Sequence, residues 1–322
     1  MVQISIALDR YDRHFPFFDG TVEPPSDIDL KVFQVGQTVV LRDGEFRHER
    51  MLVDREFDVC EFSLSSYLMA KDRGLDITAV PVFPRRLFSP GLFYVRSDSL
   101  INTPRDLIGR RVGVNSFQTT LSVLARGDLQ RVYGVPWKEI TWCVANAEKV
   151  AFKSQHGVAI KNLGAGADLG LAMAEGMIDA FIHPHPPASV MGGQIAVRRL
   201  FSDAQREELR YYQSSGYFPI MHVMAMQSTL AESRPDVPLM VMNLFEQAKR
   251  ISRGYFDDPN WSQLAWGRKY FEDERQLLAA DVWSIGVREN EKNLCDFIEY
   301  MLDQGLISRR LTVDELFAPS TL

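Results

Sequence analysis

The chain has 322 residues, of which 46% are hydrophobic and 24% are charged. This length predicts two domains of about 150 residues each, and the composition is that of a soluble globular protein, which excludes disordered, collagen-like and membrane-embedded classes. The net charge of -6 excludes a general nucleic-acid-binding protein and leaves small anions held by local cationic pockets.

The N-terminal segment and the cysteines indicate a compartment. Residues 2–8 are apolar but are followed at once by Asp9 and Arg10, so the stretch is too short for the core of a signal peptide. No later segment approaches the roughly 18 uninterrupted apolar residues of a membrane-spanning helix. The three cysteines are far apart and lack metal-binding spacing. We therefore expect a cytoplasmic protein with no membrane partner.

Short apolar runs alternate with helical patterns through most of the first two thirds of the chain. We predict strands at 4–8, 30–35, 80–83, 92–95 and 111–114. We predict helices at 63–73, where Ser63 is the N-cap, and from Thr119 onward. Beyond Ser228 the pattern becomes that of amphipathic helices, at 239–253, 273–282 and 289–302. Strands interleaved with helices predict an α/β fold with a mainly parallel sheet.

Two segments of the chain echo each other. Residues 56–66 read EFDVCEFSLSS and residues 175–189 read EGMIDAFIHPHPPAS. Each has an acidic residue, a short strand introduced by Asp, and then a loop of small or polar residues. Open α/β sheets bind ligands at the carboxyl ends of their strands, so two lobes would each present such a loop to a ligand.

A third loop follows the strand at 111–114. Backbone amides and hydroxyls at the start of the next helix form an anion site suited to a carboxylate, although simple helix capping explains the same residue types. The residues of this loop are Ser116, Phe117, Gln118, Thr119 and Thr120.

Six sequence motifs together resemble the 4,5-dihydroxyphthalate decarboxylase family, whose members are cytosolic enzymes built on a type 2 periplasmic-binding-protein architecture. The motifs are YDR at 11–13, FDVCEFSLSSYLMA at 57–70, PVFPRR at 81–86, DLIGRRVGV at 106–114, GYFPIMH at 216–222 and QGLISRRLTVDELFAP at 304–319. They cover nearly the whole chain in the order of the family. The chain departs from the family at Ser89-Pro90, where the family has an Arg-His pair, and at His183-Pro-His185, where it tends to have an Arg.

The resemblance implies a two-lobed α/β fold with a hinge, a cleft between the lobes and a helical C-terminal region. The first lobe would be discontinuous, with residues 1–95 and 223–322, and the second would hold residues 96–222. The chain would then cross the hinge near Val95 and return near His222.

Decarboxylation of a hydroxylated aromatic acid requires a proton donor for the ring carbon that loses its carboxylate. His222 is the first candidate, because an imidazole with an ordinary pKa of about 6.5 suits proton transfer. Glu61 follows a predicted strand, and a carboxyl near a bound carboxylate would have a raised pKa. Asp12 is the third candidate, as a base or as the residue that orients Arg13. The structural alternatives are a buried strand histidine, support for the helix N-terminus by Glu61, and a plain ion pair between Asp12 and Arg13.

Arginines are the expected carboxylate ligands, because a guanidinium pairs with a carboxylate through two hydrogen bonds. Arg86 is the leading candidate, Arg13 is the second, and Arg85 is expected to be solvated. Hydroxyl donors and flat aromatic walls complete the candidate substrate site. These are Ser63, Ser65, Ser66, Phe117 and Phe218, with Tyr67 as a further aromatic.

His183 and His185 form an H-x-H pair. On an extended strand both rings would face the same side, and with His222 or Asp12 as a third ligand they would make a metal site. The alternative is a polar lining that replaces the family arginine as a contact for anions or hydroxyls. No nucleotide-binding or serine-hydrolase motif is present in the sequence, and we expect no organic cofactor.

These observations predict a cofactor-independent decarboxylase of a small hydroxylated aromatic or heteroaromatic carboxylate, with 4,5-dihydroxyphthalate as the substrate that the resemblance implies. The first alternative is a non-catalytic binding protein for a small anionic metabolite. The second is a metal-assisted lyase or hydrolase on the same scaffold. The amphipathic C-terminal helices are compatible with a homo-oligomer.

Overall fold

The computed structural model describes residues 1–37, 39–148, 150, 152, 157–278 and 281–322. The chain divides into two compact units, and each contains a β-sheet with helices, as the predicted α/β class requires. The first unit holds Met1–Arg85, His222–Lys292 and Leu311–Leu322, and the second holds Arg86–Met221 and Asn293–Arg310.

Two segments that we expected in the first lobe belong to the second unit. The segment at 86–95 leads into β5 (Phe93–Arg96), which pairs with strands of the second sheet. The segment at 293–310 packs on the second unit through Tyr300 of α11 (Glu291–Asp303), and a Cβ added to Gly127 would lie 2.2 Å from the Tyr300 ring. Helical periodicity in the sequence identifies α11 but does not say which sheet it covers.

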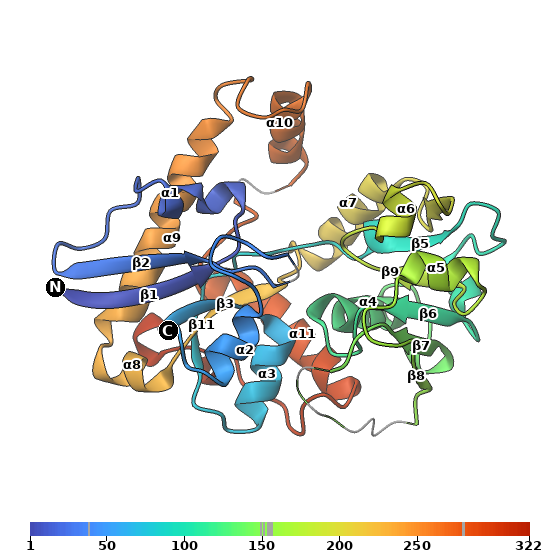
Figure 1. Ribbon diagram of the computed structural model, residues 1–322, viewed down its shortest axis with the longest axis horizontal. Coiled ribbons are helices and arrows are strands. Elements are labelled where there is room, and N and C mark those ends of the chain that lie inside the picture. The colour runs from blue at the N-terminus through green and yellow to red at the C-terminus, as the bar shows by residue number, and fades with distance from the viewer. Residues whose placement is uncertain (38, 149, 151, 153–156, 279–280) are drawn as a thin grey trace. The chain divides into compact units, whose positions relative to one another are not determined.

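The described part of the first unit contains a five-stranded sheet in the order β2-β1-β3-β11-β4 (Figure 1). β1 is parallel to β2 and β3, whereas β11 is antiparallel to β3 and β4. The strands are β1 (Val2–Leu8), β2 (Ile28–Gln34), β3 (Val59–Ser63), β4 (Thr78–Val80) and β11 (His222–Met226). The helices are α1 (Phe15–Phe18), α2 (Arg47–Leu52), α3 (Leu64–Asp72), α8 (Ser228–Ser233), α9 (Asp236–Tyr255) and α10 (Gly267–Leu277).

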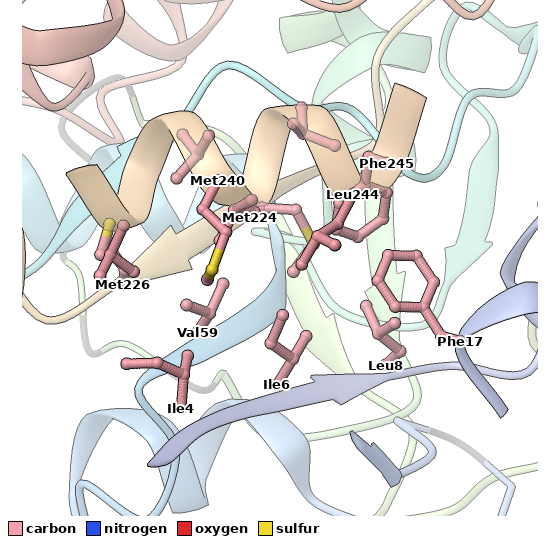
Figure 2. Close-up of a cluster of buried hydrophobic side chains, with 14 of the residues drawn as sticks. Ile4, Ile6, Leu8, Phe17, Val59, Met224, Met226, Met240, Leu244 and Phe245 are labelled. Atoms are coloured by element: carbon pink, nitrogen blue, oxygen red, sulfur yellow. The ribbon is translucent and has the colours of Figure 1, made fainter. Parts of the chain in front are cut away.

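The core of the first unit lies between this sheet and α9 (Figure 2). Side chains alternate across a strand, so Ile4, Ile6 and Leu8 of β1 share the face that is directed at the helix. On α9, Met240 and Leu244 stand four residues apart and so lie on one stripe of the helix. Burial of these side chains anchors β1 and β3, whose carboxyl ends carry the polar residues described below.

The described part of the second unit contains a six-stranded sheet in the order β10-β5-β9-β6-β7-β8 (Figure 1). β6 pairs in parallel with β7 and β9, but β5 is antiparallel to both of its neighbours, so both sheets are mixed rather than mainly parallel. The strands other than β5 are β6 (Arg111–Val114), β7 (Thr141–Val144), β8 (Ile160–Asn162), β9 (Ala180–Ile182) and β10 (Val197–Arg199). The helices besides α11 are α4 (Thr120–Arg131), α5 (Leu169–Ala174), α6 (Ala188–Met191) and α7 (Ala204–Ser215).

The two similar segments at 56–66 and 175–189 have a similar local structure, in which an Asp precedes a parallel strand. Asp58 precedes β3, and its carboxylate accepts a hydrogen bond from the amide of Ser5 on β1 at 2.8 Å. Asp179 precedes β9, and its carboxylate accepts from the amide of Arg111 on β6 at 2.9 Å. Each Asp thus fixes the start of one parallel strand against the next.

Most predicted elements are present within a few residues of the expected bounds. The main difference is the helix predicted at 273–282, because the structure places α10 at Gly267–Leu277, and residues 279–280 lie outside the described part of the chain. No helix within the described ranges is both long and apolar enough to cross a bilayer.

Asp128 of α4 is a fully buried carboxyl group in the second unit. It accepts hydrogen bonds from the hydroxyls of Ser89 at 2.6 Å, Tyr211 at 3.1 Å and Tyr300 at 3.3 Å. Burial raises the pKa of Asp128 to about 7, against the lowering effect of these hydroxyls. The network therefore joins α4, α7 and α11 through a carboxyl that loses its proton near neutral pH.

This network predicts a pH-dependent stability. Because the pKa of Asp128 in the folded protein lies above its ordinary value of 3.8, the stabilisation from this carboxyl is complete below pH 3.8 and is lost as the pH rises through about 7. Asp128→Asn should therefore gain roughly 2 kcal/mol of unfolding free energy over wild type on going from pH 5 to pH 8. Urea unfolding at both pH values measures this, with Asp98→Asn on the surface as the control. An Asp128→Asn difference that does not change with pH would contradict the assignment.

Candidate functional site

Polar residues of the first unit gather where three parallel strands end. The carboxyl ends of β1 and β3 adjoin, and β11 begins beside the end of β3, with His222 opposite Ser63 in the register. Glu61 lies opposite Met224, so Glu61 and His222 are diagonal neighbours on one face of the sheet. The sheet itself therefore places a carboxylate and an imidazole within reach of each other.

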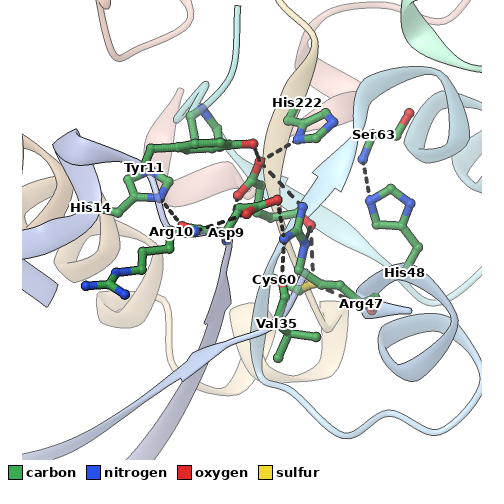
Figure 3. A network of polar contacts seen from close by, with 12 residues as sticks. Asp9, Arg10, Tyr11, His14, Val35, Arg47, His48, Cys60, Ser63 and His222 are labelled. Atoms are coloured by element: carbon green, nitrogen blue, oxygen red, sulfur yellow. Dashed lines mark hydrogen bonds and ion pairs between the residues drawn. The ribbon is translucent and has the colours of Figure 1, made fainter. Parts of the chain in front are cut away.

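Glu61 is the centre of this network and has no exposed surface. Its Oε1 lies 2.5 Å from His222 Nδ1 and accepts a hydrogen bond from the Tyr11 hydroxyl at 3.1 Å. Its Oε2 accepts from the backbone amide of Asp9 at 3.1 Å. Figure 3 shows the side chains of Tyr11, Arg47 and His222 directed toward this point from separate segments of the chain.

Arg47 supplies the positive charge that balances Glu61. It is the first residue of α2 and is fully buried. Its Nε donates to the carbonyl of Glu61 at 2.7 Å, its Nη1 donates to the carbonyl of Val35 at 2.6 Å, and its Nη2 lies 3.5 Å from Glu61 Oε1. Asp9 Oδ2 lies 3.5 Å from Nη1. One guanidinium therefore ties together the ends of β1, β2 and β3.

The charge states of the pair follow from these contacts. Burial alone would raise the pKa of Glu61, but the Arg47 charge and the hydrogen bond from His222 outweigh it and hold that pKa well below its usual value. Burial lowers the pKa of His222, although Glu61 acts in the opposite direction. At neutral pH Glu61 is therefore ionised and His222 is neutral. His222 then donates its Nδ1–H to Glu61, which leaves Nε2 as the proton-accepting atom.

Tyr11 and His14 complete the network from the segment after β1. Burial raises the pKa of Tyr11, and Glu61 raises it further, so the phenol stays protonated and donates to Glu61. His14 is buried, and its Nδ1–H donates to the carbonyl of Asp9 at 2.9 Å. Burial lowers the pKa of His14 to about 4, so this ring is neutral as well.

The predicted serine ligands lie at the start of α3 and are buried. His48 of α2 accepts a hydrogen bond through Nε2 from the amide of Ser63 at 3.1 Å, and its ring centroid lies 6.1 Å from that of His222. The hydroxyls of Ser63 and Ser65 are 3.2 Å apart, and Ser66 is 5% exposed. These serines therefore adjoin the network, and their hydroxyls lie inside the protein.

Asp12 and Arg13 lie outside the hydrogen-bonded network. The Asp12 carboxylate accepts from the Arg13 amide at 2.7 Å, and its side chain is 47% exposed. The Arg13 guanidinium donates to the carbonyl of Pro84 and lies 4.2 Å from the ring centroids of both Tyr11 and Trp283. The Arg13 guanidinium thus packs against the Tyr11 ring. Asp12 and Glu61 lie in the described part of the chain, and the structure shows no hydrogen bond between them.

The two neighbouring arginines differ in burial and in the unit to which they belong. Arg86 is 3% exposed, belongs to the second unit, and donates to the carbonyl of Phe218 at 2.8 Å. Arg85 is partly exposed and belongs to the first unit, and its own carbonyl accepts from the His222 amide at 3.2 Å. Within the described residues no hydrogen bond or ion pair engages the Arg85 side chain. Its charge nevertheless acts on His222, whose pKa is lowered first by burial and further by Arg85.

The predicted anion loop of the second unit is the turn before α4. The amides of Phe117 and Gln118 donate to the two carboxylate oxygens of Glu148, at 2.6 and 3.1 Å. The Phe117 ring is buried and stacks on Phe152, so it packs in the core instead of forming an open wall. Ser116 and Thr120 are also buried, and the Thr119 hydroxyl lies 2.6 Å from that of Ser122. The loop has the geometry of an anion site, with a carboxylate of the protein itself in place.

The remaining candidates of the second unit are engaged locally. The His183 ring contacts the backbone of His185, and the two ring centroids are 6.2 Å apart. The Phe218 ring packs on Phe88 with a centroid separation of 4.6 Å. Among the described residues no group of three histidine, cysteine or acidic side chains is placed to hold a metal ion. His183 and His185 belong to the second unit and His222 to the first.

The network contains residues that we did not predict, among them Tyr11, Arg47 and His14. Tyr11 stands in the YDR motif, beside the two charged residues that we chose instead, so the motif carried the signal. Arg47 begins a short helix and reaches the strand ends from outside any motif. Arg85 was expected to be solvated, and the structure shows its side chain partly exposed.

Comparison with known proteins gives two curated relatives. The chain is 34% identical, over all of its length and 98% of the relative, to a protein of Comamonas testosteroni named 4,5-dihydroxyphthalate decarboxylase. It is 31% identical, over 67% of its length and 83% of the relative, to a Pseudomonas putida protein of the same name. No family model matches the chain.

Solved structures support the fold. The periplasmic aliphatic sulphonate binding protein SsuA from Escherichia coli superimposes with a TM-score of 0.57 at 14% identity, over 100% of this chain and 99% of that protein. At this identity the match speaks for the architecture alone, and it agrees with the periplasmic-binding-protein-like fold expected from the sequence.

Proposed function

The chain belongs to the 4,5-dihydroxyphthalate decarboxylase family, and we propose that it removes one carboxylate of 4,5-dihydroxyphthalate as carbon dioxide. The remaining product is 3,4-dihydroxybenzoate. The observation that supports this activity in the protein itself is the buried pair of Glu61 and His222, in which an ionised carboxylate holds an imidazole at 2.5 Å. A pair of this kind moves protons, which is the chemistry that the reaction needs.

The substrate supports its own decarboxylation without an added electron sink. Each carboxylate lies para to a hydroxyl, so protonation of the ring carbon that bears the carboxylate gives a cation that the hydroxyl oxygen stabilises as a dienone-like species. The bond to the carboxylate then breaks, its electron pair restores the aromatic ring, and carbon dioxide leaves. We propose on this basis that the reaction uses neither an organic cofactor nor a metal ion.

His222 is the proposed proton donor to the ring carbon. In the free protein the imidazole is neutral, but a bound dicarboxylate brings negative charge close to it and favours the imidazolium. Glu61 stabilises that imidazolium through the hydrogen bond at Nδ1, while Nε2 transfers its proton to the ring. Proton transfer to the ring carbon returns His222 to the neutral form, carbon dioxide then leaves, and solvent supplies one proton in each cycle.

Arg85 is the proposed ligand for the carboxylate that stays on the ring. A cation on the departing carboxylate would oppose its conversion to neutral carbon dioxide, so the guanidinium is better placed on the other one. Arg85 is partly exposed and its charge reaches His222, which fits this role better than the buried Arg86. The buried hydrogen bond of Arg86 to Phe218 supports a structural role for that residue.

The role of Arg85 predicts a selective loss of substrate binding. Arg85→Gln should raise KM about tenfold, while kcat changes less, because a hydrogen bond to a carboxylate is lost at a partly exposed position. Steady-state kinetics with 4,5-dihydroxyphthalate measure both constants, and Arg110→Gln, at an exposed arginine of the second unit, is the control. An unchanged KM in Arg85→Gln would remove Arg85 from the site.

A panel of aromatic acids tests the proposed function as a whole. Purified protein treated with a chelator is incubated with 4,5-dihydroxyphthalate, phthalate, 3,4-dihydroxybenzoate and hydroxybenzoates, and carbon dioxide and products are analysed by mass spectrometry. We expect turnover of 4,5-dihydroxyphthalate and none of phthalate, which lacks the para hydroxyl. Binding without carbon dioxide release across the panel would favour a non-catalytic binding protein instead.

A further inference from the structure

The turn before α4 in the second unit already holds a carboxylate. Glu148 spans two successive backbone amides, with Oε1 2.6 Å from the Phe117 nitrogen and Oε2 3.1 Å from the Gln118 nitrogen. These amides lie in the turn that leads into the twelve-residue α4, just before its N-cap Thr119. The unpaired N–H groups and the dipole at the start of a helix favour an anion nearby. The side-chain oxygen of Gln118 in turn accepts from the amide of Val150 at 3.1 Å.

A buried arginine, Arg126, contacts the Phe117 residue of this turn. Arg126 has no exposed surface, and its guanidinium carbon lies 3.6 Å from the centroid of the Phe117 ring. Its Nη2 donates to the carbonyl of Phe117 at 2.5 Å and its Nε donates to Gln304 at 2.7 Å. Its Nη1 is buried and makes no hydrogen bond with any described residue.

The charge of Arg126 is incompletely balanced. Burial lowers the pKa of Arg126 to about 9, and Glu148 is the carboxylate whose charge acts against this lowering. Glu148 itself is only partly buried. A partly exposed carboxylate is thus held by two amides, and its charge acts on a fully buried cation that has an unused donor. This combination suits a site for an exchangeable anion.

We propose that Glu148 is an internal stand-in for a ligand carboxylate, and that a small aromatic carboxylate displaces it from the amides of Phe117 and Gln118. The inference rests on the proposed function only for the choice of an aromatic carboxylate as the ligand. Because Glu148 competes for the same donors, it lowers the fraction of protein that is ready to bind and so weakens the observed affinity. An uncharged aromatic ligand cannot replace it, since Arg126 would then lose its counter-charge.

Removal of Glu148 tests the proposal with phthalate as the probe, because phthalate offers carboxylates but no para hydroxyl. In the full-length protein, Glu148→Ala should lower the Kd of phthalate about tenfold in calorimetry. Phthalate should also shift the ¹⁵N-amide resonances of Phe117 and Gln118 in the wild-type protein. Benzamide, which is uncharged, should do neither.

Asp168 provides the matched control. Its partly buried carboxylate also accepts a backbone amide, that of Leu171 at 3.0 Å, at the start of α5. Asp168→Ala should leave the Kd of phthalate unchanged. Glu148→Gln keeps the size of the side chain and serves if the alanine variant is poorly folded, with a smaller gain in affinity expected.

An unchanged or higher Kd of phthalate in both Glu148 variants would overturn the proposal and leave Glu148 as a permanent helix cap. Amide resonances of Phe117 and Gln118 that do not shift when phthalate is added to the wild-type protein would also overturn it. Carbon dioxide release from 4,5-dihydroxyphthalate is measured in the same preparations. Tighter phthalate binding in Glu148→Ala without any carbon dioxide release from the wild-type protein would support this inference and refute the decarboxylase activity. Normal carbon dioxide release with unchanged phthalate binding would support the decarboxylase activity and refute this inference.

Discussion

Replacement of His222 by alanine should lower kcat for decarboxylation by about a thousandfold and leave much of the affinity for the substrate. The reason is that His222 Nε2 delivers the proton to the ring carbon, and loss of a general acid typically costs a factor of about 10² to 10⁴ in rate. The carboxylate contact proposed for Arg85 does not involve the imidazole, so binding persists. Carbon dioxide release and calorimetric binding of phthalate measure the two effects separately.

Chemical rescue distinguishes a missing proton donor from a damaged fold. The truncation leaves a space next to Glu61, and added imidazole can occupy it and donate the proton. We expect imidazole to restore part of the activity of His222→Ala and to have no such effect on wild type. Normal turnover in His222→Ala would show that the proton comes from another group, and a loss of binding together with activity would point to a structural role for His222.

Replacement of Glu61 by glutamine should have the largest effect on stability, a loss of about 3 to 5 kcal/mol in the free energy of unfolding. The variant leaves the fully buried Arg47 without its main counter-charge. It also removes the negative charge that stabilises the His222 imidazolium, so kcat should fall by about a hundredfold. Urea unfolding and steady-state kinetics measure these two losses.

The surface pair of Glu56 and Arg50 is the matched control for this substitution. Its carboxylate lies 2.5 Å from the guanidinium, but the Glu56 side chain is 42% exposed, so Glu56→Gln should cost less than about 1 kcal/mol. Adding Arg47→Met to Glu61→Gln should recover part of the lost stability, because the uncompensated buried charge is then removed. If Glu61→Gln costs no more than Glu56→Gln, the Glu61 and Arg47 pair is not the anchor of the strand ends.

The local features of the fold could be predicted from the sequence because they depend on neighbouring residues. Alternation in residues 2–8 gives β1, and the aspartates before β3 and β9 mark two strands that begin in the same way. The assignment of α11 to the second unit could not be predicted, since it depends on the fit of Tyr300 over Gly127, which are far apart in the chain. The antiparallel orientation of β5 to β9, and of β11 to β3, could not be predicted either, because it depends on the path of the chain and not on the residue pattern of a strand.

The residues of the candidate site also fall into those that could be predicted from the sequence and those that could not. Glu61 and His222 were predicted from the acid-base chemistry of their side chains, and the register of β3 and β11 brings them together. Arg47 was missed, because a buried arginine on a short helix has no sequence signature. The burial of Arg86 and the partial exposure of Arg85 could not be predicted, because periodicity does not decide in a loop which of two adjacent side chains is buried.

The turn before α4 could be predicted from the sequence only in part. Its amides were predicted to hold a carboxylate, and the structure places the carboxylate of Glu148 there. A sequence pattern can identify donors at a helix start, but it cannot tell that a residue some thirty positions further along reaches back to them. The function of this loop therefore depends on whether Glu148 leaves when a ligand arrives.

The most direct test of the central claim is the reaction itself, run in deuterium oxide. Purified protein treated with a chelator is mixed with 4,5-dihydroxyphthalate, and the products are analysed by mass spectrometry and NMR. We expect one carbon dioxide for each 3,4-dihydroxybenzoate, with a single deuterium on the ring carbon that lost the carboxylate, and a rate that falls about a thousandfold in His222→Ala. Recovery of unchanged substrate from the wild-type protein, bound or free, would contradict it.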